Sequence, residues 1–178
     1  MRLQICAAAF VFGTASAAGH DAAHSHAASA HTHGTAEVQI AVDERGVTAT
    51  LRIAGMSAIG FERAPRSTEE TRRLDDFRRT AARGDWLVWS AAADCRLIDS
   101  SVSAPGFDEP GSAANGQHAE FHATLNYRCT DRTLLSGVSV KLLDAAHSLD
   151  TVNVEWITPD AQGAATVDRR SERVAFTP

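Results

Sequence analysis

The distribution of apolar and polar residues predicts a chain built largely of short β-strands. Apolar and polar side chains alternate from Glu37 to Val42 and again from Val47 to Ile53, on the two sides of the turn DERG at 43–46. A period of two is typical of strands with one buried face, and a short turn ending in glycine is suited to reversing the chain. We therefore predict a β-hairpin at the start of the folded domain.

One stretch has a helical pattern instead. Its apolar residues at helical spacing are Leu74, Phe77 and Ala81. Ser67 is followed three residues later by Glu70, which predicts a capping box that satisfies free N–H groups at the start of a helix. Gly84 ends the pattern. These signals predict one main helix over residues 68–83, with only short helical turns elsewhere.

Strand-like segments dominate the rest of the chain, separated by turns and by a Gly/Pro-rich loop at 105–117. They are DWLVW at 85–89, CRLIDSSVSA at 95–104, HAEFHATLNYRC at 118–129, GVSVKLL at 137–143, DTVNVEWIT at 150–158, AATVD at 164–168 and RVAF at 173–176. Because only one long helix is inserted among them, we expect an antiparallel α+β domain rather than alternating βαβ units.

The strand predicted at 118–129 has an apolar face and a face that carries metal-binding groups. The apolar positions include Phe121, Ala123, Leu125 and Tyr127, and the opposite positions begin with His118, Glu120 and His122. Imidazole nitrogen and carboxylate oxygen are both zinc ligands. Neighbours on this face are about 7 Å apart and can share one ion, whereas His118 and His122 are about 13 Å apart on a straight strand. We expect one neighbouring pair to bind a metal ion, completed by His31, His33 or water.

Histidine is also concentrated before the first predicted strand, where five of the eight histidines lie between positions 20 and 33. Imidazoles on a flexible backbone are suited to metal acquisition, so we predict secondary metal binding by His20, His24 and His26. The alternative for this histidine-rich segment is a low-complexity polar linker. The alternative for the strand predicted at 118–129 is an exposed polar face that binds no ligand. His147 is expected to be a surface or packing histidine.

The first residues predict export. A short basic start precedes an apolar segment too short to span a membrane, and TASAAG at 14–19 supplies small residues for cleavage after Ala17 or Ala18. We predict a signal peptide over 1–18, a flexible His-containing arm over 19–32 and a single domain over 33–178. The mature protein is expected to be exported and not to be an integral membrane protein.

Two cysteines follow the predicted signal peptide, Cys95 and Cys129. In an oxidising compartment an even pair favours a disulfide, and thiolate metal ligands are the alternative. If the bridge closes one end of an antiparallel strand pair, residues 104–106 should lie close to His118 and Glu120. The net charge of −5 argues against a nucleic-acid partner.

Enzyme motifs are weakly represented. HAEFH is not the helical HExxH of zinc proteases, and the sequence contains neither GxSxG nor a P-loop. We expect no enzyme. A site with three ligands and a water could still hydrolyse a substrate, so a metal-dependent hydrolase remains one alternative. A protein-interaction module with an incidental histidine face is another.

Three motifs occur in a fixed order along the chain: HTHG at 31–34, GFERAP at 60–65 and HAEFHA at 118–123. With the cysteine pair and VNVEWITPDAQGA at 152–164, they make the chain resemble the ZrgA-like family of periplasmic zinc-binding proteins. The resemblance implies that zinc is the bound metal. It also implies a role in scavenging zinc or delivering it to a zinc uptake transporter or its binding protein.

Two departures from the family pattern limit what the resemblance implies. Similar sequences often carry a His-rich insertion before the HAEFHA motif, whereas residues 104–117 contain no histidine here. Arg63 also stands where similar sequences often have histidine. We therefore expect this chain to lack any extra, weaker zinc sites that the insertion confers.

Overall fold

Two β-sheets and one long helix make up the computed structural model, which describes residues 32–107 and 118–176. The strands are β1 (Thr35–Asp43), β2 (Gly46–Ala54), β3 (Leu87–Trp89), β4 (Cys95–Ser103), β5 (Glu120–Cys129), β6 (Gly137–Val140), β7 (Thr151–Ile157), β8 (Gln162–Val167) and β9 (Arg173–Ala175); the helices are α1 (Gly55–Ile59) and α2 (Thr68–Arg83). One sheet has six strands in the order β4-β5-β2-β1-β7-β8, and the other has three in the order β3-β6-β9. No helix in the described ranges is both long and apolar enough to cross a membrane.

The predicted hairpin is confirmed. β1 and β2 pair antiparallel in continuous register from Ala36 opposite Ile53 to Asp43 opposite Gly46. The Asp43 carboxylate accepts hydrogen bonds from the backbone N–H groups of Arg45 and Gly46, and this closes the turn. Alternate side chains of both strands are buried, as a strand with one face on the core requires.

The expectation of a purely antiparallel sheet is wrong at one pairing. β7 lies beside β1 and runs parallel to it, with Thr35 opposite Thr151 and Ala41 opposite Ile157. A parallel pair needs a long connection, and here the chain between β1 and β7 forms most of the domain before returning. The alternation in β7 predicts a strand, but it contains no information on the direction of the neighbour.

The predicted helix is confirmed at both ends as α2. The Ser67 hydroxyl accepts a hydrogen bond from Glu70 N at 3.2 Å, and Gly84 adopts the left-handed conformation at the C-cap. The other half of the capping box differs from the prediction, because the Glu70 carboxylate accepts from Arg66 N and from the Arg63 guanidinium. The predicted apolar stripe, Leu74, Phe77 and Ala81, is buried.

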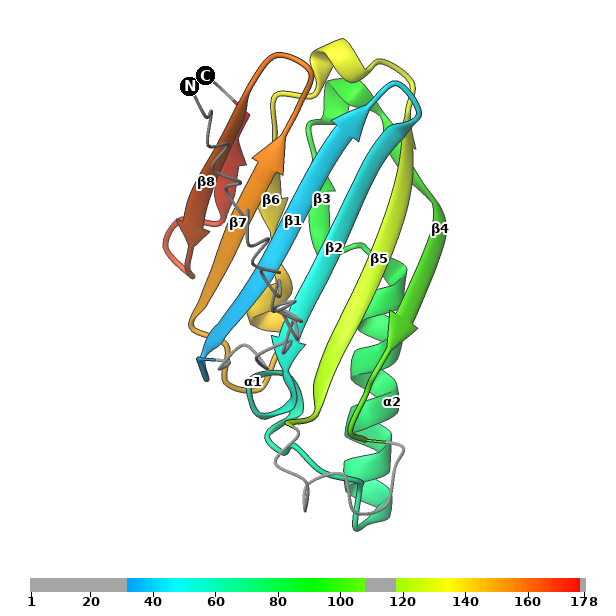
Figure 1. The fold of residues 1–178 in the computed structure, drawn as a ribbon, viewed down its shortest axis with the longest axis vertical. Coiled ribbons are helices and arrows are strands. Elements are labelled where there is room, and N and C mark those ends of the chain that lie inside the picture. The colour runs from blue at the N-terminus through cyan, green and yellow to red at the C-terminus, as the bar shows by residue number, and fades with distance from the viewer. Residues whose placement is uncertain (1–31, 108–117, 177–178) are drawn as a thin grey trace, which may run out of the picture.

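The core lies between two layers. Figure 1 shows the six-stranded sheet in front, with α2 and the three-stranded sheet behind it. Phe77 of α2 packs against Phe121 of β5, with ring centroids 4.6 Å apart. The separate small sheet was not predicted. Its strands are also shorter than expected, since β3 covers only residues 87–89 and a 3₁₀ turn begins directly after β6.

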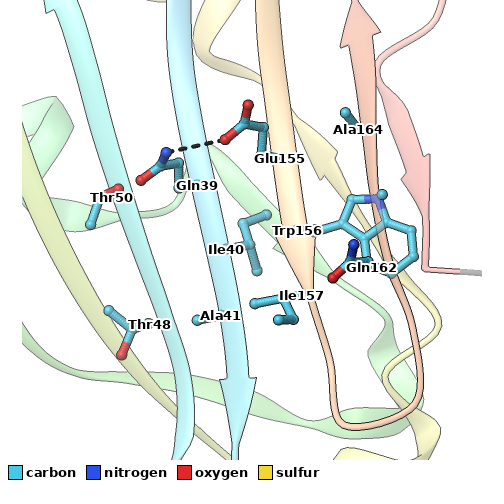
Figure 2. A pocket seen from close by; sticks show the side chains of 11 residues that line it. Gln39, Ile40, Ala41, Thr48, Thr50, Glu155, Trp156, Ile157, Gln162 and Ala164 are labelled. Atoms are coloured by element: carbon cyan, nitrogen blue, oxygen red, sulfur yellow. Dashed lines mark hydrogen bonds between the residues drawn. The ribbon is translucent and has the colours of Figure 1, made fainter.

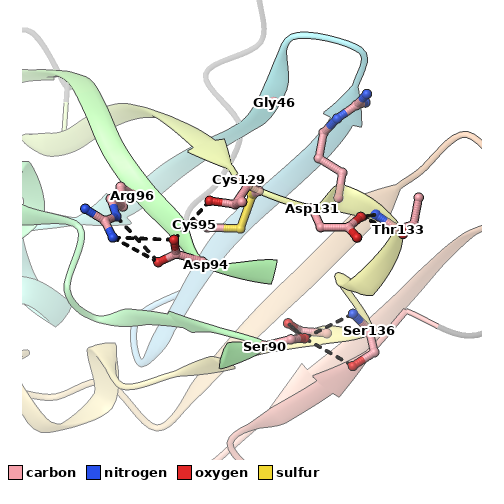
Figure 3. Close-up of a disulfide and its surroundings, with 12 residues drawn as sticks. Gly46, Ser90, Asp94, Cys95, Arg96, Cys129, Asp131, Thr133 and Ser136 are labelled. Carbon is pink, nitrogen blue, oxygen red and sulfur yellow. Dashed lines mark hydrogen bonds and ion pairs between the residues drawn. A yellow bond between two sulfur atoms is a disulfide. The ribbon is translucent and has the colours of Figure 1, made fainter. Parts of the chain in front are cut away.

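The predicted disulfide is present and closes one end of the β4–β5 pair. Cys95 and Cys129 are direct partners in the antiparallel register, and their sulfur atoms are bonded (Figure 3). At the other end of the pair, Glu120 N donates to Pro105 O at 3.2 Å. The expected proximity of residues 104–106 to Glu120 is therefore confirmed.

Replacing both cysteines by serine should lower the free energy of unfolding by about 4 kcal/mol in the chain-entropy model, given a separation of 34 residues. Urea unfolding of the parent and the double variant measures this difference. Thiol labelling of the unfolded, unreduced mature protein is the control for pairing. Two reactive thiols per chain would contradict the assignment.

Candidate metal centre

The predicted metal ligands of the described residues gather where β2 ends. β2 pairs antiparallel with β1 on one side and β5 on the other, so β1 and β5 both begin beside the end of β2 (Figure 1). The chain leaves β2 directly into α1 and the loop at 60–65. His33 precedes β1, His118 precedes β5 and Glu62 lies in this loop. Three segments far apart in the sequence therefore meet at one edge.

Glu62 connects the two histidines. Its Oε1 lies 3.1 Å from His33 Nε2, and its Oε2 lies 2.8 Å from His118 Nδ1. The Glu62 side chain is only 11% exposed, whereas the imidazoles are 57% and 60% exposed. Glu62 is absent from the ligands predicted by the sequence. Its place in the GFERAP segment at 60–65 is the signal that could have revealed it.

Backbone contacts fix the position of His33. The neighbouring Gly34 has a φ of +83°, and a Cβ atom there would lie 2.9 Å from Asp150 Oδ2. Glycine is therefore required after His33. Gly34 N donates to the hydroxyl of Ser57, which is fully buried in α1, and Gly34 O accepts from Asp150 N. These bonds attach the start of β1 to α1.

His118 is held through its neighbour. Ala119 O accepts a hydrogen bond from Gly55 N at 2.8 Å, the first residue of α1. A Cβ atom on Gly55 would come within 2.6 Å of Phe61 O and within 2.9 Å of Ala119 O, so only glycine permits this approach. The strand itself begins at Glu120 rather than at the predicted His118. His118 is therefore free of the strand register and reaches Glu62.

The loop that carries Glu62 is anchored on both sides. Phe61 is buried and packs edge-on against Phe107, with ring centroids 5.8 Å apart. Arg63 forms two hydrogen bonds with the carboxylate of Glu70, at 2.8 and 2.6 Å. These bonds from Arg63, together with the hydrogen bond from Arg66 N, lower the pKa of Glu70 to about 2. The Glu62 carboxylate also accepts from Met56 N at 3.3 Å.

Glu120 and His122 form a second, separate pair. His122 Nε2 lies 2.6 Å from Glu120 Oε1, but this buried nitrogen makes no hydrogen bond within the described residues. Glu120 Oε2 accepts a hydrogen bond from Arg52 Nη2 at 3.3 Å. The structure therefore groups His118 with Glu62 and His33, and it groups Glu120 with His122 and Arg52.

The remaining candidates lie elsewhere. His147 is exposed and packs against Gly60, where an added Cβ would lie 3.0 Å from the imidazole, in agreement with the predicted surface or packing role. His20, His24, His26 and His31 fall outside the described residues. An open depression of about 640 Å³ on the outer face of β1, β2, β7 and β8 has no histidine in its lining (Figure 2).

The cluster around Glu62 offers the chemistry of metal binding. A ring nitrogen that faces a carboxylate carries the proton, so the other nitrogen keeps a lone pair for a metal. Here the lone pairs belong to His33 Nδ1 and His118 Nε2. Among residues 32–107 and 118–176, no three His, Cys, Asp or Glu side chains stand close enough to enclose a metal ion. Binding therefore requires the exposed imidazoles to turn or a further ligand to join them.

The described residues thus form a β-rich domain with imidazole and carboxylate groups gathered at one sheet edge. A family model described as "ZrgA family zinc uptake protein" matches residues 30–176. The chain therefore belongs to the ZrgA family, and this membership associates it with zinc uptake. A comparison with curated proteins gives no match.

The ion pair between Arg63 and Glu70 should make stability depend on pH. The pKa of Glu70 is lowered from 4.5 to about 2, so its charged form stabilises the fold above pH 4.5 and this contribution is lost as the pH falls toward 2. Glu70→Gln should therefore lower the urea midpoint at pH 7, and its difference from the parent should shrink between these two values. Glu69→Gln, whose partners are exposed arginines, is the matched control. A difference that does not change with pH would contradict this role.

Proposed function

We propose that this protein is a periplasmic zinc-binding protein that scavenges zinc or delivers it to a zinc uptake system. Family membership supports zinc as the cargo. The disulfide supports an oxidising compartment, and the signal-like first 18 residues support export. The proposed organisation is a signal peptide over 1–18, an arm over 19–32 and a zinc-binding domain over 33–178.

The observation that carries this proposal is the shared carboxylate of Glu62. Two imidazoles from distant parts of the chain hydrogen-bond to its two oxygens. A purely structural glutamate would gain as much from an arginine, which forms two parallel bonds with a carboxylate. Orienting two exposed histidines instead is the arrangement by which a carboxylate fixes the tautomer of metal ligands and raises their basicity. We propose that His33 and His118 bind zinc and that Glu62 positions both.

Two protein ligands leave coordination positions for others. Zinc sites are commonly tetrahedral, and His31 is two residues from His33, so we propose that His31 or water completes the site. Exposed ligands and an incomplete protein shell favour a site that exchanges its ion, as capture and delivery require. Nitrogen and oxygen donors also accept nickel, cobalt and copper(II), so zinc is assigned by the family rather than by the donors.

The Glu120–His122 pair is less favourable for zinc in this protein. Its carboxylate already bonds to the Arg52 guanidinium, and a cation in that position repels a second one. We therefore propose the cluster around Glu62 as the tightest zinc site. Glu120 and His122 lie within β5 and form a separate nitrogen and oxygen pair.

Single substitutions test the proposed site. His33→Ala and His118→Ala should each weaken the tightest zinc site at neutral pH by at least tenfold, because each removes one ligand. Glu62→Gln should weaken it by about 10- to 100-fold, the usual effect of losing a carboxylate that orients a ligand. Isothermal titration of the mature protein with zinc measures all three.

His147→Ala is the matched control, since this histidine is exposed and forms no hydrogen bond or ion pair with Glu62 among the described residues. It should bind zinc as the parent does. If His33→Ala and His118→Ala also retain the parent affinity while remaining folded, the tight site lies elsewhere and the proposal fails.

The arm makes an independent prediction. Deleting residues 19–30 removes His20, His24 and His26, so the zinc stoichiometry should fall. The melting temperature of the metal-free domain should change little, because the deleted segment has no apolar periodicity with which to join a core. Metal analysis and thermal unfolding measure the two effects, and a large loss of stability would show a structural arm.

A further inference from the structure

We propose that Arg52 occupies the place of a metal ion at a second site on the sheet, and thereby excludes divalent metal from Glu120 and His122. This inference rests on the proposed zinc-binding function, and it concerns a different set of side chains from the cluster around Glu62. In this proposal, the side chain of Arg52 limits the number of zinc ions that the domain binds.

The register of three strands brings the groups together. Arg52 of β2 is the direct partner of Glu37 on β1 and of His122 on β5. All three side chains lie on the more exposed face of their strands. Among the described residues, α2 and the three-stranded sheet lie behind the six-stranded sheet (Figure 1). Glu120 lies two residues before His122, on the same face. An acidic group, a guanidinium and an imidazole thus form one row across the sheet.

The guanidinium forms ion pairs with the acidic groups on both sides. Arg52 Nη2 is 3.3 Å from Glu120 Oε2, and Nη1 is 3.7 Å from Glu37 Oε2. The Arg52 side chain is 39% exposed and the Glu120 side chain is 15% exposed. One fixed positive charge therefore sits between two carboxylates, in a position that a metal ion would need in order to use either of them.

His122 supplies the observation that points to a ligand. Its Nε2 is buried and pairs with Glu120 Oε1 at 2.6 Å without the geometry of a hydrogen bond, while the His122 side chain as a whole is 41% exposed. A ring nitrogen and a carboxylate oxygen at this distance are held together by a shared proton or by a shared cation. Two zinc ligands with bonds of about 2 Å in a tetrahedral site lie about 3.3 Å apart. A small outward movement would therefore convert this pair into a chelate.

The charge on Arg52 decides whether this happens. A guanidinium neutralises Glu120 and repels an incoming dication across a short distance, in a partly buried location where screening is reduced. Without that charge, His122 and Glu120 offer one nitrogen and one oxygen ligand, with Glu37 adding negative potential nearby. The ligand class is a borderline divalent cation such as zinc, nickel or cobalt.

The test compares Arg52→Gln with Arg52→Lys in the mature protein, using zinc titration and metal analysis after dialysis. Arg52→Gln should bind one more zinc equivalent than the parent, because the blocking charge is gone. Arg52→Lys retains the charge and should keep the parent stoichiometry. The additional equivalent should disappear when Arg52→Gln is combined with His122→Ala, and it should persist when it is combined with His118→Ala.

Two results would overturn the proposal: a folded Arg52→Gln protein with the parent stoichiometry, or an additional equivalent that survives His122→Ala. Arg52→Thr, which places a strand-favouring residue at the same position, replaces the glutamine variant if the latter does not fold. The outcome is separable from the proposed function. If the cluster around Glu62 binds no zinc, Arg52→Gln still gains an equivalent that depends on His122, whereas failure at Arg52 leaves the effect of His118→Ala intact.

Discussion

The antiparallel pairing of β2 with both β1 and β5 is the constraint on which the candidate site depends. It brings the starts of β1 and β5 to the end of β2, and the chain that leaves β2 must cross that same end. His33, Glu62 and His118 are separated by dozens of residues in the sequence, yet the strand register brings the segments that carry them to the same edge of the sheet. The close approach of Gly55 to Ala119 and the bond from Gly34 to Ser57 then fix the three segments within hydrogen-bonding distance.

The core side of this edge is tightly packed, whereas its solvent side carries exposed histidines. Behind it, Phe61, Phe107 and Phe121 pack in sequence, with ring centroids 5.8 and 4.9 Å apart. In front of it, both imidazoles are more than half exposed. A fixed carboxylate with accessible histidines combines a defined position with easy ligand exchange. This combination is what the proposed zinc site needs in order to bind and release its ion.

The HAEFH segment shows how one sequence pattern can serve two environments. Its alternation predicts the buried face of β5 correctly, since Phe121, Ala123, Leu125 and Tyr127 are all buried. The polar positions are not equivalent, however. His118 lies before the strand and turns to Glu62, whereas Glu120 and His122 are inside the strand and face Arg52. A β-strand period assigns residues to a face but does not identify the neighbours across it.

The sequence by itself determined the hairpin, the limits of α2, the disulfide and the buried face of β5, because each depends on local periodicity, on capping residues or on the count of cysteines. It also proposed His31, His33, His118, Glu120 and His122 as metal ligands, without separating those near Glu62 from those near Arg52. Only the tertiary structure decided that β7 runs parallel to β1, that a second sheet forms, that Glu62 joins the two histidines and that Arg52 bonds to Glu120. These features depend on which strands become neighbours and in what register, and that outcome is set by the packing of the whole core.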